Sequence, residues 1–143
     1  MRLTKNFDSK IDFKLDDNSP QWQYDMAYLH ARRLQIIREY VPIPIIVTNF
    51  YRSPEKNANT KYAAMRSLHT RGLAVDITVK KGYESLLLLI YDFCRKHMDY
   101  GELFLYELPD GILDSIHISL PALNNNKETL RYIKSPDGKL VKK

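Results

Sequence analysis

The stretch LAVDITV, residues 73–79, decides the fold because its side chains alternate between two kinds. Successive residues of an extended chain point to opposite faces, so strict alternation predicts a strand with one face in the core. The apolar face would carry Leu73, Val75, Ile77 and Val79, and the other face would carry Ala74, Asp76 and Thr78. Asp76 is therefore an ionisable residue on the non-core face of an apolar strand, where packing alone requires no charge.

Other segments have the residue types of strands. The segment IIVTNF (45–50) is rich in β-branched residues, and ELFLYE (102–107) and SIHISL (115–120) are short and largely apolar. Residues 129–142 have the pattern of a hairpin that turns at SPDG (135–138). We expect these segments to form one sheet with residues 73–79.

Two segments follow the spacing of an amphipathic helix. The first opens at Ser19-Pro20 and ends before Pro42, and we expect its apolar stripe to cover the core. That stripe comprises Trp22, Met26, Leu29, Ile36, Ile37 and Tyr40. The second follows Gly82 and ends near residues 97–100, while the Ser-Pro pair of YRSPEKN (51–57) predicts a turn. The order of helix, strands, helix and strands predicts an α+β fold, a small and mostly antiparallel sheet with flanking helices.

The composition indicates one domain over residues 1–143, with residues 135–143 expected to fray at the C-terminus. A chain of this length buries roughly two thirds of the surface that its unfolded form exposes, so its core needs no covalent staples. The single cysteine, Cys94, excludes a disulfide framework and a cysteine-rich metal cluster. A bound metal ion would therefore need histidine and carboxylate ligands.

The charge balance excludes little by itself. A net charge of +5 with ten tyrosines suits an anionic partner, such as nucleic acid or the bacterial cell wall. Because the sequence has no zinc finger, basic helix or aromatic RNA-binding signature, we expect no nucleic-acid partner. The N-terminal residues are charged throughout, and the longest aliphatic run, LLLLI (86–90), is too short to span a membrane. We expect cytoplasmic synthesis without a signal peptide and no membrane association.

Two histidines can join Asp76. In SIHISL the isoleucines share one face, which leaves His117 on the other, as Asp76 is in its own strand. His69 lies seven positions before Asp76, beyond Gly72, in the loop that feeds the strand. Two histidines and one carboxylate suit a zinc ion with an open fourth position. A histidine on a strand is more commonly a surface or structural residue, so spacing alone leaves both interpretations open.

The stretch SLHTRGLAVDI (67–77) resembles the signature of the zinc peptidases of the M15 type, Ser-x-His-x-x-Gly-x-Ala-x-Asp. This group includes D-alanyl-D-alanine carboxypeptidases and the L-alanyl-D-glutamate endopeptidases of phage endolysins. The signature residues are Ser67, His69, Gly72, Ala74 and Asp76. The family's later histidine in a short strand is matched by His117, and its arginine in a YRSP turn is matched by Arg52. The resemblance covers most of residues 1–120, and its features look like those of small phage and prophage members.

The resemblance implies a role for each of these residues. His69, Asp76 and His117 would hold Zn²⁺, which polarises the scissile carbonyl and lowers the pKa of a bound water. The family places the general base three positions before the last histidine, which is Asp114 here. Strict alternation would turn Asp114 away from His117, so Asp114 must lie in a loop or at a bulge, and Glu107 and Asp110 are alternatives.

The resemblance also implies a substrate-binding role for two residues. Arg52 would stabilise the developing negative charge on the carbonyl oxygen or hold a substrate carboxylate, and Ser67 would form a hydrogen bond at the substrate's end. The sequence also departs from the family pattern. Ser115 stands where many relatives have tryptophan, Asn49-Phe50 replaces a common Ser-Gly, and the stretch from Glu107 to His117 is longer.

The fold implied by the resemblance is the Hedgehog/DD-peptidase-like one. The implied activity is zinc-dependent hydrolysis of peptide bonds in bacterial peptidoglycan stem peptides, by an endopeptidase or a D,D-carboxypeptidase. We expect a phage or prophage product that is monomeric and acts at the cell wall, either released there or carried in the virion. The alternative class is a binding protein, either a non-catalytic wall-binding protein or a basic nucleic-acid-binding protein.

Overall fold

The computed structural model describes residues 1–64, 67–121 and 127–143. Within these residues six strands form one sheet in the order β1-β2-β4-β3-β5-β6. The strands are β1 (Ile46–Asn49), β2 (Ala74–Thr78), β3 (Glu102–Glu107), β4 (Leu113–Ser119), β5 (Glu128–Lys134) and β6 (Leu140–Lys142). Every neighbouring pair is antiparallel except β3 and β5, which run parallel. The predicted α+β class with a mostly antiparallel sheet is therefore confirmed.

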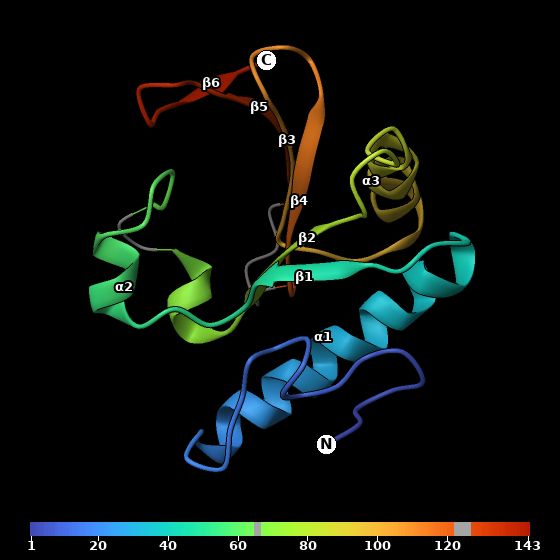
Figure 1. The fold of residues 1–143 in the computed structure, drawn as a ribbon, viewed down its shortest axis with the longest axis vertical. Coiled ribbons are helices and arrows are strands. Elements are labelled where there is room, and N and C mark those ends of the chain that lie inside the picture. The colour runs from blue at the N-terminus through green and yellow to red at the C-terminus, as the bar shows by residue number, and fades with distance from the viewer. Residues whose placement is uncertain (65–66, 122–126) are drawn as a thin grey trace.

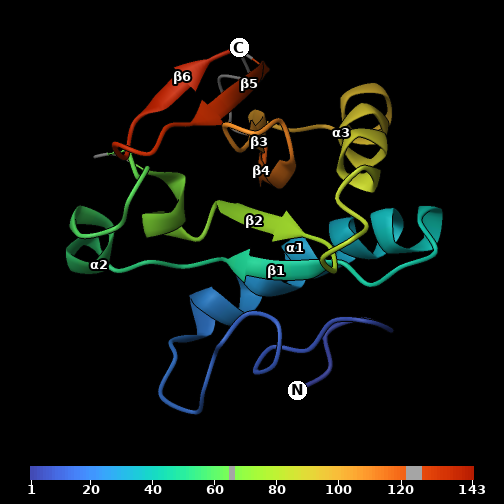
Figure 2. The ribbon, with the colours of Figure 1, turned by 45° about the horizontal axis from the view of Figure 1, so that its top comes forward.

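The helices lie around this sheet as Figures 1 and 2 show. They are α1 (Gln21–Tyr40), α2 (Pro54–Ala58), the short 3₁₀ helix η1 (Leu68–Arg71) and α3 (Leu86–His97). The first two strands, β1 and β2, have α2 and η1 beyond one end and α3 beyond the other (Figure 2). The predicted turn at YRSPEKN begins a helix instead, because the Ser53 hydroxyl accepts a hydrogen bond from the Lys56 N–H and Pro54 occupies the first helical turn.

The first helix exists as predicted, but the face assigned to the core was wrong. Trp22, Leu29, Ile36 and Tyr40 are exposed, and of the predicted stripe only Ile37 is buried. The buried face consists of Gln23, Ala27, His30, Ala31, Leu34 and Ile37. The buried face therefore combines the small Ala27 and Ala31 with Leu34 and Ile37, which pack in the core cluster.

One face of the central strands forms the core. The core residues of these strands are Val75, Ile77, Leu103, Leu105, Ile116 and Ile118, each almost fully buried. They pack in one cluster with residues from α1 and α3, among them Leu34 and Leu87. The alternation read from the sequence of β2 is confirmed, since Val75 and Ile77 face this core. The residues between them in each strand point to the opposite face, which carries polar side chains.

The strand register sets the polar face. Asp76 pairs directly with His117, and Phe104 pairs with His117 from the other side. Further along β4, Tyr106 pairs with Ser115 but Glu107 pairs with Leu113, so Asp114 is an extra residue in β4. A bulge of this kind interrupts strict alternation, as a base at Asp114 would need.

The C-terminal hairpin is also confirmed, with its turn at residues 135–138 and the Ser135 N–H donating to the Lys139 carbonyl at 2.9 Å. Residues 140–142, which fall in the segment expected to fray, form β6, and the Lys143 N–H donates to the Arg131 carbonyl at 3.0 Å. The hairpin contacts the loop before η1, where the Tyr62 hydroxyl donates to the Ser135 carbonyl at 2.6 Å.

Candidate metal centre

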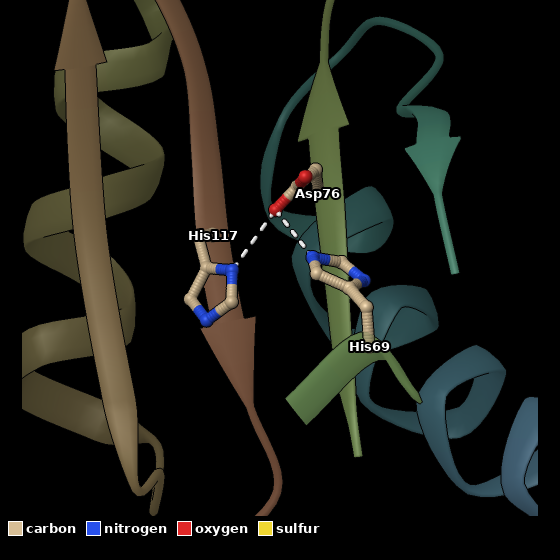
Figure 3. A group of neighbouring side chains, drawn as sticks. All are labelled: His69, Asp76 and His117. Carbon is tan, nitrogen blue, oxygen red and sulfur yellow. Dashed lines mark hydrogen bonds and ion pairs between the residues drawn. The ribbon is translucent and has the colours of Figure 1, made fainter. Parts of the chain in front are cut away.

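Two of the predicted ligands meet across neighbouring strands. Because Asp76 on β2 and His117 on β4 are direct antiparallel partners, their side chains share the polar face. The His117 Nδ1 atom lies 3.0 Å from the Asp76 Oδ1 atom, as Figure 3 shows. The other carboxylate oxygen, Oδ2, accepts a hydrogen bond of 3.1 Å from the side-chain amide of Asn49, the partner of Asp76 on β1.

His69 reaches the same point from η1. The Ser67 hydroxyl caps this helix by accepting the His69 N–H at 3.2 Å, and Gly72 ends it with a φ of 65°. A side chain at Gly72 would be strained at this φ, and its Cβ would lie 3.2 Å from the Trp22 ring. Because residue 72 is glycine, the chain can turn there from η1 into β2.

The loop is also fixed from behind. The buried His30 ring on α1 donates through Nε2 to the Gly72 carbonyl at 2.8 Å, so His30 has a structural role here. His69 Nδ1 lies 2.7 Å from the Phe50 carbonyl, which only accepts hydrogen bonds and so places the proton on Nδ1. The Nε2 atom of His69 then points at Asp76, 3.1 Å from Oδ1 (Figure 3).

The donor atoms fit a zinc ion. His69, Asp76 and His117 each offer one ligand atom, and these atoms all lie within 4.8 Å of one another. His69 Nε2 is buried and, among the described residues, has no hydrogen-bond partner, although Asp76 Oδ1 is close to it. A buried nitrogen without a partner is costly, and a metal ion would satisfy it. Two imidazole nitrogens and a carboxylate oxygen are ligands that zinc accepts.

The charges of the group support one another. Burial alone would raise the pKa of Asp76, but its contacts with His117 and His69 hold the pKa of this carboxyl well below its usual value. Burial also opposes a charge on His117, yet the carboxylates of Asp76 and Glu102 raise the pKa of His117 from 6.5 to about 9. The cluster thus favours an ionised Asp76, which is the state a cation binds.

Glu102 is a site residue that the sequence reasoning missed. Its Oε1 atom lies 2.8 Å from His117 Nε2, on the side of the ring opposite Asp76. Phe104, from the same strand, stacks on the His117 ring with centroids 5.0 Å apart and an angle of 13°. Glu102 and Phe104 alternate on the polar face of β3, a pattern visible in ELFLYE, but their partner becomes evident only from the register of β3 on β4.

Arg52 and Ser67 lie together beside this group. The Arg52 Nη2 atom donates to the Ser67 hydroxyl at 3.1 Å, and the Arg52 N–H donates to the His69 carbonyl at 3.1 Å. The Arg52 side chain is buried, which lowers its pKa from the usual value, and its Nε atom has no partner among the described residues. Both residues line a cavity of about 320 Å³ that also contains the three candidate ligands.

Asp114 lies next to the group but not in that cavity. Its carboxylate and that of Asp76 line a second hollow of about 260 Å³, which shares Asn49 and Lys134 with the first. The Lys134 Nζ atom lies 2.7 Å from Asp114 Oδ2, and the Ser115 hydroxyl donates to the same oxygen at 3.1 Å. The structure therefore brings Asp114 beside Asp76 and pairs it with a lysine from β5.

The two alternative acids lie elsewhere. Glu107 is buried and forms ion pairs with Arg131 at 3.2 Å and Lys143 at 2.8 Å. Asp110 is exposed in the turn between β3 and β4, where its Oδ1 atom accepts the Ile112 N–H at 3.0 Å. Neither residue lines either hollow, so Asp114 is the one of these three acids that shares a hollow with a candidate ligand.

Two departures from the family pattern now have structural meaning. Asn49 binds the carboxylate of Asp76, and Ser115 binds the carboxylate of Asp114. Phe50, the second substituted residue of its pair, is buried and supplies the carbonyl that binds His69. The side chains of Asn49 and Ser115 therefore hold carboxylates of the polar face, while position 50 contributes through its backbone.

A His-Asp-His group beside a buried arginine, on the polar face of an α+β sheet, has the features of a metal-dependent hydrolase. A family model described as Peptidase M15 matches residues 8–109 of the chain. The protein belongs to this family, and membership implies a metallopeptidase. The matched range contains Arg52, Ser67, His69 and Asp76 and ends before Asp114 and His117.

Comparison with curated protein sequences found no match. Among the described residues, no helix is long and apolar enough to cross a membrane.

Proposed function

We propose that this protein is a zinc-dependent peptidase that hydrolyses peptide bonds in the stem peptides of bacterial peptidoglycan. The observation that carries the proposal is the convergence of His69 Nε2, Asp76 Oδ1 and His117 Nδ1, with the first of these atoms buried and unpartnered among the described residues. Membership of the M15 peptidases supports the reaction class. The substrate comes from the resemblance of SLHTRGLAVDI to the peptidoglycan-cleaving members.

His69, Asp76 and His117 would hold the zinc ion, which supplies Lewis-acid polarisation of the scissile carbonyl and acidifies water. The Phe50 carbonyl orients the His69 ring, and the Asn49 amide holds the carboxylate of Asp76. These contacts preset the ligand atoms, so binding the ion requires little rearrangement of the chain.

Asp114 would accept a proton from the attacking water and deliver one to the leaving amine. Its place in the second hollow, which Asp76 also lines, supports this role. Lys134 and Ser115 hold one oxygen of Asp114, which leaves Oδ1 as the atom available for the proton.

Arg52 would bind the negative charge that develops on the carbonyl oxygen, or a carboxylate of the substrate. Its burial and its unpartnered Nε atom support this role, because a buried guanidinium without a carboxylate partner favours an incoming anion. Ser67 would contact the substrate's end while it positions Arg52. If Arg52 binds the terminal carboxylate of the substrate, the enzyme would be a D,D-carboxypeptidase. If the enzyme cleaves an internal peptide bond, it would be an endopeptidase.

We further propose that the protein is a monomeric phage or prophage product that meets the cell wall after release from the cell or from a virion. The rival function is wall binding without catalysis. The ion pair between Lys134 and Asp114 is the observation that favours this rival, because a permanently paired carboxylate is a poorer base.

Digestion of purified peptidoglycan tests the proposal. The zinc-loaded protein should release new amino groups while reducing sugar ends stay constant, and mass spectrometry of the fragments identifies the cleaved bond. Chelation of zinc and the His117→Ala change should each abolish the release. New reducing ends would contradict the peptidase assignment, and wall binding without release of amino groups would support the rival function.

A further inference from the structure

The His117 ring lies between two carboxylates. Its Nδ1 atom is 3.0 Å from Asp76 Oδ1, and its Nε2 atom is 2.8 Å from Glu102 Oε1. The ring is buried and stacked on Phe104, so it cannot exchange these partners by turning freely. Both nitrogens therefore have defined neighbours, and the two neighbours are chemically alike.

A histidine that ligates a metal must present a lone pair from one nitrogen while the other keeps its proton. In His117 the nitrogen that faces Asp76 and His69 is Nδ1, and Figure 3 shows it directed at the shared carboxylate oxygen. The proton must then stay on Nε2, where Glu102 accepts it. A carboxylate in this position also strengthens the ligand by withdrawing its proton slightly.

Glu102 is held for this task by its strand. Its N–H donates to the Ser119 hydroxyl at 2.7 Å, which anchors the start of β3 against β4. Its side chain lines the cavity that contains the candidate ligands and is 29% exposed, and among the described residues its one ion-pair partner is His117. Neither the sequence signature nor the proposed reaction assigns it a role.

We propose that Glu102 is a positioning residue that fixes the tautomer and orientation of His117, so that Nδ1 serves as the zinc ligand. The proposal rests on the zinc site of the proposed function and extends it to β3. Loss of the carboxylate frees the ring nitrogen and weakens zinc binding without removing a ligand.

Zinc affinity, measured by competition with a chromophoric chelator, tests the proposal. Glu102→Ala should weaken zinc binding by about 10-fold to 100-fold, the usual cost of losing such a partner. Glu102→Gln should lose less, because its amide oxygen can still accept the Nε2 proton. Nitrogen-15 NMR of the imidazole rings should show His117 protonated at Nε2 in the zinc-loaded wild-type protein and in Glu102→Gln.

The matched control is Glu128→Ala, which removes a carboxylate from the β5 residue that pairs with Glu102 and lines the same cavity. Its zinc affinity should stay within about twofold of wild type, because an exposed charge is screened by solvent. Unchanged affinity in Glu102→Ala, or a His117 protonated at Nδ1, would overturn the proposal. If Glu102→Ala does not fold, the NMR signature of the wild-type ring decides the question.

The two proposals fail in different ways. If zinc binding depends on Glu102 as predicted but no amino groups are released from peptidoglycan, the positioning role of Glu102 stands and the peptidase proposal fails. If the protein hydrolyses stem peptides but its zinc affinity does not depend on Glu102, the peptidase proposal stands and the positioning role of Glu102 fails.

Discussion

The two faces of the central strands solve the same problem of burial in opposite ways. On the core face, Ile116 and Ile118 are buried by packing against other apolar side chains. On the polar face, His117 between them is also buried, but its surroundings are Asp76, Glu102 and the Phe104 ring. Packing needs only shape and volume, whereas buried polar atoms need specific partners. The polar face therefore carries the specificity, and the Nε2 atom of His69 beside it has no hydrogen-bond partner among the described residues.

Two buried histidines show the contrast in their ionisation. Burial on the inner face of α1 lowers the pKa of His30 from 6.5 to about 4. Although burial acts in the same direction on His117, its two carboxylates raise the pKa to about 9. One side of the sheet thus keeps a histidine neutral, and the other is built around negative charge that a cation can use.

Removing a ligand should break the contrast most strongly. His117→Ala should abolish stoichiometric zinc binding, measured by elemental analysis, because two remaining ligands hold zinc poorly. Zinc at a free concentration about a thousandfold above its dissociation constant should stabilise the wild-type protein by about 4 kcal/mol and the variant by far less. His97→Ala, an exposed histidine on α3, serves as the control. One zinc per chain in His117→Ala would remove His117 from the ligand set.

The next prediction compares two acids near the bulge in β4. Asp114 lines a hollow with Asp76, whereas Glu107 is buried in ion pairs with Arg131 and Lys143. Asp114→Asn should keep zinc and fold while the turnover number falls by roughly two to four orders of magnitude, the contribution of general acid–base catalysis. Glu107→Gln should keep turnover and lose stability, since it breaks ion pairs with Arg131 and Lys143. Turnover on a soluble stem peptide and urea unfolding measure both effects. An active Asp114→Asn beside an inactive, zinc-loaded Glu107→Gln would transfer the base to Glu107.

The buried histidine on the core side predicts a pH dependence. Because the pKa of His30 in the folded protein, about 4, lies below its unfolded value of 6.5, its stabilising contribution is complete above pH 6.5. That contribution is lost as the pH falls toward 4, when the unfolded chain takes up a proton that folded His30 does not. His30→Gln lacks this loss, so the stability difference between the two proteins should shift by roughly 2–3 kcal/mol between pH 7.5 and pH 4.5.

Urea unfolding of both metal-free proteins measures this shift. The two proteins differ only at residue 30, so the difference between their stabilities reports on that residue. A stability difference that does not change with pH would show that His30 is not held neutral by burial.

The smallest effect is expected at Ile116, which is next to His117 in β4 but lies on the core face of that strand. Ile116→Val removes one methylene from a fully buried side chain and should lower the free energy of unfolding by about 0.5–1.5 kcal/mol. Zinc affinity should stay unchanged, because the side chain points away from His117. A loss of zinc affinity would mean that the two faces are coupled through the strand rather than independent.

Local patterns in the sequence predicted much of this architecture. The alternation of LAVDITV, the apolar segments around it and the SPDG turn led to the α+β class and the C-terminal hairpin. The possible ligand atoms of the three predicted metal-binding residues all lie within 4.8 Å of one another. These features were accessible because alternation, turn residues and a contiguous motif are local properties that tertiary context seldom overrides.

Other features depended on distances that the sequence does not contain. The buried face of α1 was decided by how the whole helix packs into the core, which buries Ala27 and Ala31 and leaves the larger Trp22 and Leu29 exposed. The place of Asp114 was decided by an extra residue in β4, which local alternation cannot reveal.

The sequence by itself determined which chemical groups the protein has and on which strand faces they lie, because the period of a strand is a local property. Only the tertiary structure decided which groups meet. Glu102 acquires its contact with His117 from the register of β3 on β4, and Lys134 reaches Asp114 because β5 joins the sheet beside β3. Register and strand order are set by the packing of the whole core, so contacts between residues far apart in the chain follow from the fold rather than from spacing.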